Sequence, residues 1–275
     1  MTGVIFGLLT ALAIGASDLF GRRIVHAQSP ITAAVPMQFF GILTAAVTLF
    51  FVSVEISLRD SLFGLVSGLG FAMGLGCYYT GLSKASSALI APTVAMLSSV
   101  LPFVYSVLGG SEPSSLTLGG ALVCLIGLAV ITIDRSAVSF DWVALKWGTL
   151  SGLGYAAGLI SLIDVSDEAG TWPAVVQRAT ACVALVVVAY RIKVPRLPAR
   201  NLRGSAVLAG IAVGLSTVFL LAGLEVDPTP TVVATSTFPA VSVLVGLVVY
   251  GDHVRHQQWW GIAIVVLGIM GVSAG

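Results

Sequence analysis

The chain has 275 residues, of which 57% are hydrophobic and only 9% are charged, and its mean hydropathy is +1.04. These values exclude an ordinary soluble domain, in which about 25% of residues are charged. The formal net charge of +1 hides a segregation of charges along the chain, and Cys77, Cys124 and Cys182 lack the paired spacing of a metal site or a disulfide framework.

Ten apolar runs follow one another, and each is long enough to cross a bilayer as a helix, which takes roughly 20 mostly apolar residues. Helices are expected because they satisfy their own backbone hydrogen bonds in lipid. The runs span residues 3–20, 31–54, 61–82, 87–109, 115–133, 142–163, 172–192, 204–224, 229–250 and 257–274. The sequence therefore predicts an all-α integral membrane protein with ten transmembrane helices.

The first five runs resemble the second five. Glycines recur at an offset of 140 or 141 positions: Gly70 and Gly74 match Gly210 and Gly214, and Gly120 and Gly127 match Gly261 and Gly268. Because five is an odd number, the second copy must enter the membrane from the opposite side. The predicted domains are thus two inverted five-helix repeats, residues 1–138 and 139–275.

Positive charges are concentrated in the odd-numbered connections between runs. These connections carry Arg22, Arg23, Lys84, Arg135, Lys146, Arg191, Lys193, Arg196, Arg200, Arg203 and Arg255, whereas the even-numbered ones carry Arg59 alone. Cytoplasmic connections retain Lys and Arg. We therefore expect the odd connections inside and both termini on the outer face of a cytoplasmic (inner) membrane. A lipid-headgroup or regulatory site is the alternative for the basic residues between 191 and 203.

Two ionisable residues lie within apolar runs, where charge is costly and commonly functional. Arg178 follows Gln177 about two turns into the seventh run, and Gln38 has a similar place in the second. A structural role for Arg178 and contact with an anionic group are both open. Asp18 precedes Arg22 by four residues, a spacing that permits an ion pair, and coupling to a proton gradient is the alternative.

Aromatic and hydroxyl side chains suit the binding of a small amphipathic molecule. Together with Gln38, Gln177 and Arg178, the predicted substrate-binding residues are Tyr78, Tyr79, Ser99, Tyr155, Thr217 and Thr237. The alternative for each is packing or hydrogen bonding between helices. Pro102 and Pro239 hold comparable places in the two halves and predict paired helix bends beside a cavity.

Two segments resemble the EamA-type ten-helix branch of the drug/metabolite transporter superfamily. They are YYTGLSKASSALIAPTVAMLSSVLPF, from Tyr78 to Phe103, and AGLEVDPTPTVVATSTFPAVSVLVGLVVYGDHV, from Ala222 to Val254. The resemblance includes Pro239 followed by Gly251 and Asp252, with Pro102 and Glu112 as the looser first-half counterpart. It implies inverted repeats around a central cavity and transport by alternating access without a bound cofactor.

The expected function is secondary transport, in the direction of export, of small metabolites, amino-acid-like solutes or drugs. A flippase for a lipid-linked sugar and a membrane-embedded lipid-metabolising enzyme are the alternatives. No catalytic residue, metal or cofactor is expected, because HExxH, phosphate-loop and serine-elbow motifs are absent from the sequence. The expected partners are a small-molecule substrate and the bilayer, with no nucleic acid, for a monomer or a homodimer.

Overall fold

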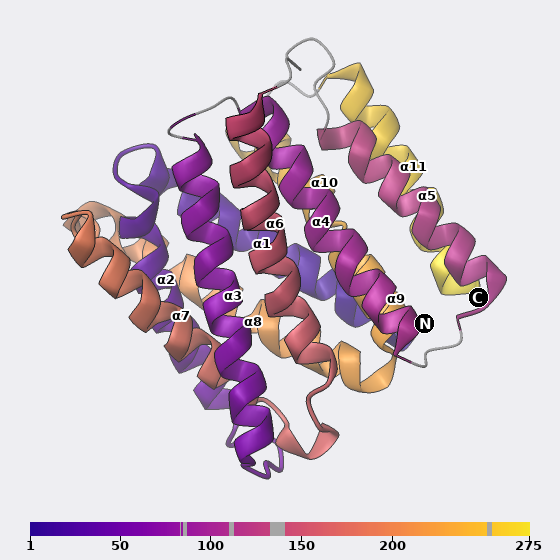
Figure 1. The fold of residues 1–275 in the computed structure, drawn as a ribbon, viewed down its shortest axis with the longest axis horizontal. Helices are drawn as coiled ribbons and strands as arrows, with labels where there is room; N and C mark the ends of the chain where they lie inside the picture. The colour runs from indigo at the N-terminus through magenta and orange to yellow at the C-terminus, as the bar shows by residue number, and fades with distance from the viewer. Residues whose placement is uncertain (83, 85–86, 110–112, 133–140, 252–254) are drawn as a thin grey trace.

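The computed structural model describes all residues of the chain except 83, 85–86, 110–112, 133–140 and 252–254, and its described part is all-helical. Figure 1 shows the helices running side by side in one bundle. The first half contains α1 (Thr2–Val25), α2 (Pro30–Thr48), α3 (Leu58–Leu82), α4 (Ser87–Leu108) and α5 (Ser115–Thr132). The second contains α6 (Trp142–Ile163), α7 (Trp172–Arg191), α8 (Arg203–Val226), α9 (Pro228–Thr235), α10 (Phe238–Tyr250) and α11 (His256–Ala274), with single 3-10 turns at Asp167–Ala169 and Arg200–Leu202. Glu112, Arg135, Asp252 and the predicted domain boundary at 138 lie outside the described residues.

Nine segments of the described chain are long and apolar enough to cross a membrane, with α9 and α10 together forming one of them (Pro228–Tyr250). Their outward faces carry exposed apolar side chains such as Leu122, Ile126, Val183 and Val187, which is the surface that lipid requires. The multi-pass membrane character predicted from composition agrees with these segments. The remaining predicted crossing corresponds to α6, which is less hydrophobic than these nine segments.

Two predicted runs differ in detail from the helices. The run at 31–54 overshoots α2, because the chain leaves the helix after Thr48 and exposes Phe50 and Phe51 before the backbone N–H of Glu55 donates to Glu168 O (2.7 Å). The run at 229–250 is two helices, since Ser236 and Thr237 interrupt it before a proline. Apolar composition therefore locates a crossing segment but does not show where its backbone turns.

The two halves are interleaved, with helices of one half packing on helices of the other. The third helix of the first half, α3, packs on α6 and α7, and the third helix of the second half, α8, packs on α1 and α2. The helix α4 of the first half packs on α6 of the second, and α9 and α10 of the second half pack on α1 of the first. The last helices of the two halves, α5 and α11, pack on each other. Figure 1 shows α5 and α11 as a pair at one side of the bundle.

Glycine backbones form the closest of these contacts. A Cβ atom added to Gly154 on α6 would lie 2.7 Å from the backbone nitrogen of Gly74 on α3. On α5, a Cβ at Gly120 would lie 2.7 Å from Gly268 O of α11, and one at Gly127 would lie 2.9 Å from Gly261 O. Small residues that allow such approach hold helices together in lipid, where the hydrophobic effect does not drive association.

The bundle has two chemically distinct ends. At the basic end, the Lys84 and Lys146 ammonium groups both lie over the Trp147 ring, at 4.9 and 5.9 Å, and the backbone N–H of Ala199 donates to Gln28 Oε1 (3.2 Å). The opposite, acidic end holds Glu55, Asp60, Asp164, Asp167, Glu168, Glu225 and Asp227. Both chain termini lie at the acidic end, since Gly3 approaches Asp227 and Gly275 approaches Ser114.

The glycine contacts predict a contrast between two substitutions. Gly154→Ala places a methyl group against the α3 backbone, and overpacking of this kind costs about 1–3 kcal/mol. Gly76→Ala is the matched control, because a Cβ atom at Gly76 has nothing within 4 Å. In a thermal-unfolding assay of detergent-solubilised protein, we expect the midpoint to fall for Gly154→Ala only. Equal midpoints for both variants would contradict the assigned α3–α6 contact.

Candidate functional site

Asp18 is an acidic side chain that faces the inside of the bundle and is nevertheless exposed. It follows Ala11 by seven residues, two helical turns, and so shares the face of α1 on which Ala11 is 0% exposed. The exposed apolar residues Ile5 and Leu12 lie on the other side of the helix. Ser242 of α10 donates a hydrogen bond to Asp18 Oδ2 (2.6 Å). A carboxylate from the first half is thus held by a hydroxyl from the second.

The expected ion pair between Asp18 and Arg22 is not formed. The Arg22 guanidinium lies 4.5 Å from the centroid of the Tyr250 ring, and its Nε donates to His26 Nε2 (3.1 Å). Arg22 thus contacts His26 and Tyr250, and Asp18 contacts Ser242.

Tyr78 and Tyr155 are two half-buried aromatic side chains on the inward faces of α3 and α6. Tyr78 lies nine residues after Leu69, which places it on the side of α3 opposite to that exposed leucine, and Tyr155 is opposite to Leu153 on α6 in the same way. The two tyrosines pack against one core cluster between α3, α4 and α6. The edge of Phe71 supports Tyr155, with ring centroids 5.6 Å apart.

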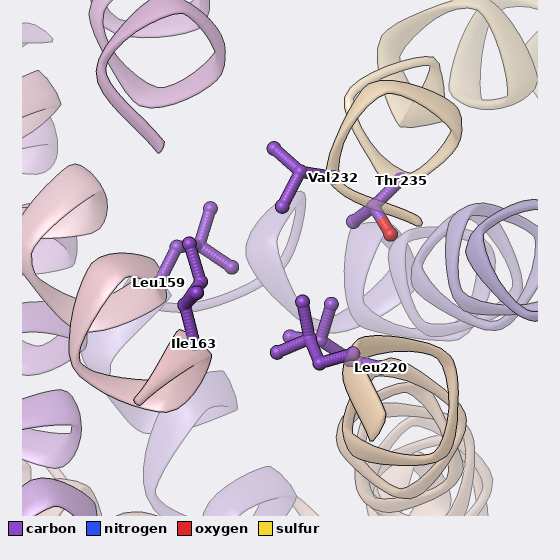
Figure 2. Close-up of a pocket in the computed structure, with 6 residues that line it drawn as sticks. Leu159, Ile163, Leu220, Val232 and Thr235 are labelled. Atoms are coloured by element: carbon purple, nitrogen blue, oxygen red, sulfur yellow. The ribbon is translucent and has the colours of Figure 1, made fainter. Parts of the chain in front are cut away.

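Toward the acidic end, the space between the halves is closed by apolar side chains. Leu159 and Ile163 of α6, Leu220 and Leu224 of α8, and Val232 of α9 converge there, and we call these five residues the apolar cap. Figure 2 shows Leu159, Ile163, Leu220 and Val232 around a cavity that Leu224 and Thr235 also line. Its volume of about 10 Å³ is about the smallest that holds one water molecule. Asp18 is thus exposed, whereas the side chains of the apolar cap leave space for about one water molecule.

Polar contacts between the halves surround the apolar cap. Ser106, near the end of α4, accepts a hydrogen bond from Thr229 at the start of α9 (3.1 Å), and both side chains are buried. The Tyr105 hydroxyl donates to the carboxylate of Asp164, the residue that caps α6. Arg59 Nη2 donates to Asp164 O (3.1 Å). These contacts tie α3 and α4 of the first half to α6 and α9 of the second at the acidic end.

Arg178 belongs to a separate, buried network between α2, α7 and α8. It is 5% exposed; Nη1 donates to Gln38 Oε1 (3.0 Å), and Nη2 donates to Val213 O (2.8 Å) and to Thr217 Oγ1. Within the described residues it forms no ion pair with a carboxylate, and its Nε has no hydrogen-bond partner. Neutral oxygens from both halves therefore solvate this guanidinium in place of water.

Gln177, the preceding residue, points to another helix. Its Nε2 donates to Ser67 Oγ of α3 (2.8 Å), and Ser67 donates to Gly158 O of α6 (2.7 Å). Gln177 Oε1 is buried without a hydrogen-bond partner among the described residues. The two neighbours on α7 thus connect that helix to α3 on one side and to α2 and α8 on the other.

The structure divides the predicted site residues into groups. Tyr78 and Tyr155 share one core cluster, and Gln38, Arg178 and Thr217 share the buried network. The Tyr79 ring contacts that of Tyr78 (ring centroids 5.6 Å apart) and also packs in a core cluster with α2 and α7. Ser99 is buried on α4, and Thr237 donates to Ala234 O (2.6 Å) at the break between α9 and α10. Pro239 directly follows that break, whereas Pro102 lies within the continuous helix α4.

Sequence reasoning missed Ser242 and the apolar cap. Ser242 is the one serine of an apolar helix, and the cap residues are ordinary aliphatic side chains in ordinary crossing segments. Only the three-dimensional arrangement of α6, α8, α9 and α10 distinguishes them from residues that pack elsewhere.

Comparisons with known proteins identify the fold and no more. No protein-family model matches the chain, and no curated protein matches it. Among the solved structures that match is one described only as "Crystal structure of protein". It has a TM-score of 0.82 at 17% sequence identity, over 99% of this chain and 98% of that one. A likeness at this identity shows that the arrangement of helices is shared.

The Arg178 network predicts that arginine and lysine are not interchangeable at this position. Arg178→Lys keeps the charge but cannot reach Gln38 and the two α8 oxygens together, and each hydrogen bond to a charged group contributes about 1.5–3 kcal/mol. We expect its thermal midpoint in detergent to fall by about 5 °C or more. Arg191→Lys, on an exposed position of the same helix, is the control and should leave the midpoint unchanged. A midpoint for Arg178→Lys equal to that of the control would refute the network's structural role.

Proposed function

We propose that the chain is a secondary transporter that exports a small solute across the cytoplasmic membrane by alternating access. In this proposal ten crossings form two inverted five-helix repeats, and the solute binds between them beside Asp18, Tyr78 and Tyr155. The observation that carries it is the interior of the bundle: an exposed carboxylate faces the interior, while an apolar cap closes the acidic end. A pathway open at one end only is what alternating access requires in each of its states.

The inverted repeat is supported by contacts between equivalent positions. Cys124 Sγ lies 3.6 Å from Val265 O, and these residues are separated by 141 positions, the same offset as the matching glycines of α5 and α11. Arg178 and Gln38 are separated by 140, the offset of the glycines on α3 and α8. Residues that meet their own counterparts lie near a twofold axis. The packing of α3 on α6 and α7 and the packing of α8 on α1 and α2 are also related by this twofold pattern.

The tenth crossing is assigned to α6. Its buried face carries small and polar residues, Gly148, Ser151, Gly152 and Gly154 among them, and α3 and α4 pack closely on that face. A helix that neighbours enclose in this way needs less hydrophobicity than one surrounded by lipid. Its low hydropathy is therefore compatible with a membrane-crossing role.

The orientation follows from the charges of the two ends. With the basic end in the cytoplasm, Asp18 is reached from inside, which is the state in which an exporter takes up its solute. In this proposal, transport is coupled to a proton gradient through Asp18. The solute is a small molecule that binds between the two halves.

Cross-linking at the acidic end tests alternating access. In a background with the three native cysteines replaced by alanine, Ser106→Cys with Thr229→Cys places two sulfurs where the hydroxyls lie 3.1 Å apart, close enough for a disulfide. The assay is counterflow of radiolabelled amines, amino acids and drugs in proteoliposomes. Oxidation should abolish transport and reduction should restore it, while each single-cysteine variant stays active.

Two results would contradict the proposal. Full transport by the quantitatively cross-linked protein would mean that the acidic end does not open, and movement of long-chain lipids with no movement of small solutes would favour a flippase. Either result can be read without knowing the native solute.

The orientation has a test of its own. A cysteine-bearing tag after Gly275 should react with a membrane-impermeant maleimide in intact cells, because the C-terminus lies at the acidic end. Protection of the tag in intact cells, with reaction only after the cells are permeabilised, would reverse the assigned orientation.

A further inference from the structure

The connection between α7 and α8, with the helix residues that flank it, carries a group of cations at the basic end. Its exposed side chains include five that we call the basic cluster: Arg191, Lys193, Arg196, Arg200 and Arg203. Successive members are two to four residues apart, and four residues span at most about 14 Å of chain. The five charges therefore lie within one region of the surface.

The basic cluster lacks a counter-charge in the described part of the protein. None of its members forms an ion pair with a described carboxylate, and the sequence has no Asp or Glu at positions 169–224. The contacts that the cluster does make are with neutral groups. Arg196 lies 5.8 Å from the centroid of the Tyr190 ring, and Arg203 Nε donates to Pro198 O (3.5 Å). Its charge thus remains available to an external anion.

Hydrogen bonds hold this connection in place on the neighbouring helices. Thr32, at the start of α2, donates to Pro195 O (2.7 Å), and the backbone N–H of Ala199 donates to Gln28 Oε1 (3.2 Å). Leu202 packs against a core cluster shared by α1, α2 and α8. The backbone that carries the cations is therefore fixed to the bundle.

Lys193 occupies a backbone position that favours glycine. Its φ is 56°, in the left-handed region, where a side chain is strained. The backbone N–H groups of Lys193 and Val194 donate to Tyr190 O (3.3 Å) and Ala189 O (3.1 Å), the hydrogen bonds that end a helix in a Schellman motif. The chain thus has a cation where the local backbone prefers glycine, and strained residues of this kind cluster at functional sites.

Exposed apolar side chains lie between the cations. Tyr190, Ile192 and Leu197 are 69%, 52% and 61% exposed. Cations beside exposed apolar groups suit the bilayer interface, where the apolar groups enter the acyl boundary and the cations meet phosphate. A dissolved anion would pair with the cations and leave the apolar side chains in water. The pattern therefore favours a lipid over a free phosphate.

We propose that the basic cluster is a binding site for the headgroups of anionic phospholipids in the leaflet that the basic end faces. Ile192 and Leu197 enter the acyl boundary beside these headgroups. The proposal goes beyond transport and does not depend on it. It also differs from an orientation signal, because the folded protein retains the lipid.

Native mass spectrometry of the purified protein in detergent counts retained lipids and gives their affinities. The probes are phosphatidylglycerol, which is anionic, and phosphatidylcholine of the same acyl chains, which is zwitterionic. Each Lys or Arg near an anionic surface contributes about fivefold in affinity. We expect phosphatidylglycerol to bind roughly 25-fold more tightly or better, which corresponds to two or more such cations.

A matched pair of double variants locates the site. Arg196→Gln with Arg200→Gln should lower phosphatidylglycerol affinity by roughly 25-fold. Lys84→Gln with Lys146→Gln removes the same charge from the same end of the bundle, where both side chains lie over Trp147. This control should leave the affinity unchanged.

Lys193 provides a variant that is expected to stay folded. Lys193→Gly should lower phosphatidylglycerol affinity about fivefold, while the thermal midpoint stays equal or rises, because glycine adopts the left-handed conformation without strain. Lys193→Arg should keep the affinity.

Several results would overturn the lipid site. They are equal affinities for the two lipids, wild-type affinity in Lys193→Gly, and equal losses in the two double variants. Full displacement of phosphatidylglycerol by millimolar inorganic phosphate would reveal a site for dissolved anions and contradict the lipid assignment. Protein that retains phosphatidylglycerol but moves no solute in proteoliposomes would contradict the transport proposal alone.

Discussion

The close approach of helix backbones at glycine is the constraint on which the rest of the molecule depends. Lipid tails solvate apolar side chains as well as other helices do, so packing and hydrogen bonding must hold the bundle together. Gly74 with Gly154, and Gly120 with Gly268, allow this contact between helices of different halves. Each half is thereby completed by the other, because α3 and α8 find their main partners across the boundary.

This interleaving determines where polar groups can lie. Arg178 and Gln177 are buried at contacts between helices of both halves, where neutral oxygens and amides replace water. Asp18 lies on the interior face of α1, accepts a hydrogen bond from Ser242 of α10 and remains exposed. The described bundle therefore contains a buried cation, Arg178, at contacts between helices and an exposed carboxylate, Asp18. Net charge alone does not reveal this division.

Much of the fold could be predicted from the sequence because the bilayer imposes a length and a composition on each crossing segment. Helices such as α8 begin and end within a few residues of the predicted runs. The break before Pro239 and the early end of α2 depend on local hydrogen bonds of Thr237 and Thr48, which hydropathy does not record. Asp18 and Arg178 were identifiable as charges at depth, but their roles depend on partners distant in sequence. Ser242 is 224 positions from Asp18, and Thr217 is 39 from Arg178.

The proposed transport pathway requires that water reaches the interior at Asp18 and does not reach it at the apolar cap. Single cysteines at Ser242, beside Asp18, and at Leu220, in the cap, can be compared in a cysteine-free background with a small charged thiosulfonate reagent. Inverted vesicles expose the basic end to the reagent, and intact cells expose the acidic end. The account predicts rapid modification of the cysteine at 242 in inverted vesicles and slow modification of the cysteine at 220 in both. A cysteine at 242 that reacts from neither side, or one at 220 that reacts as fast, would contradict it.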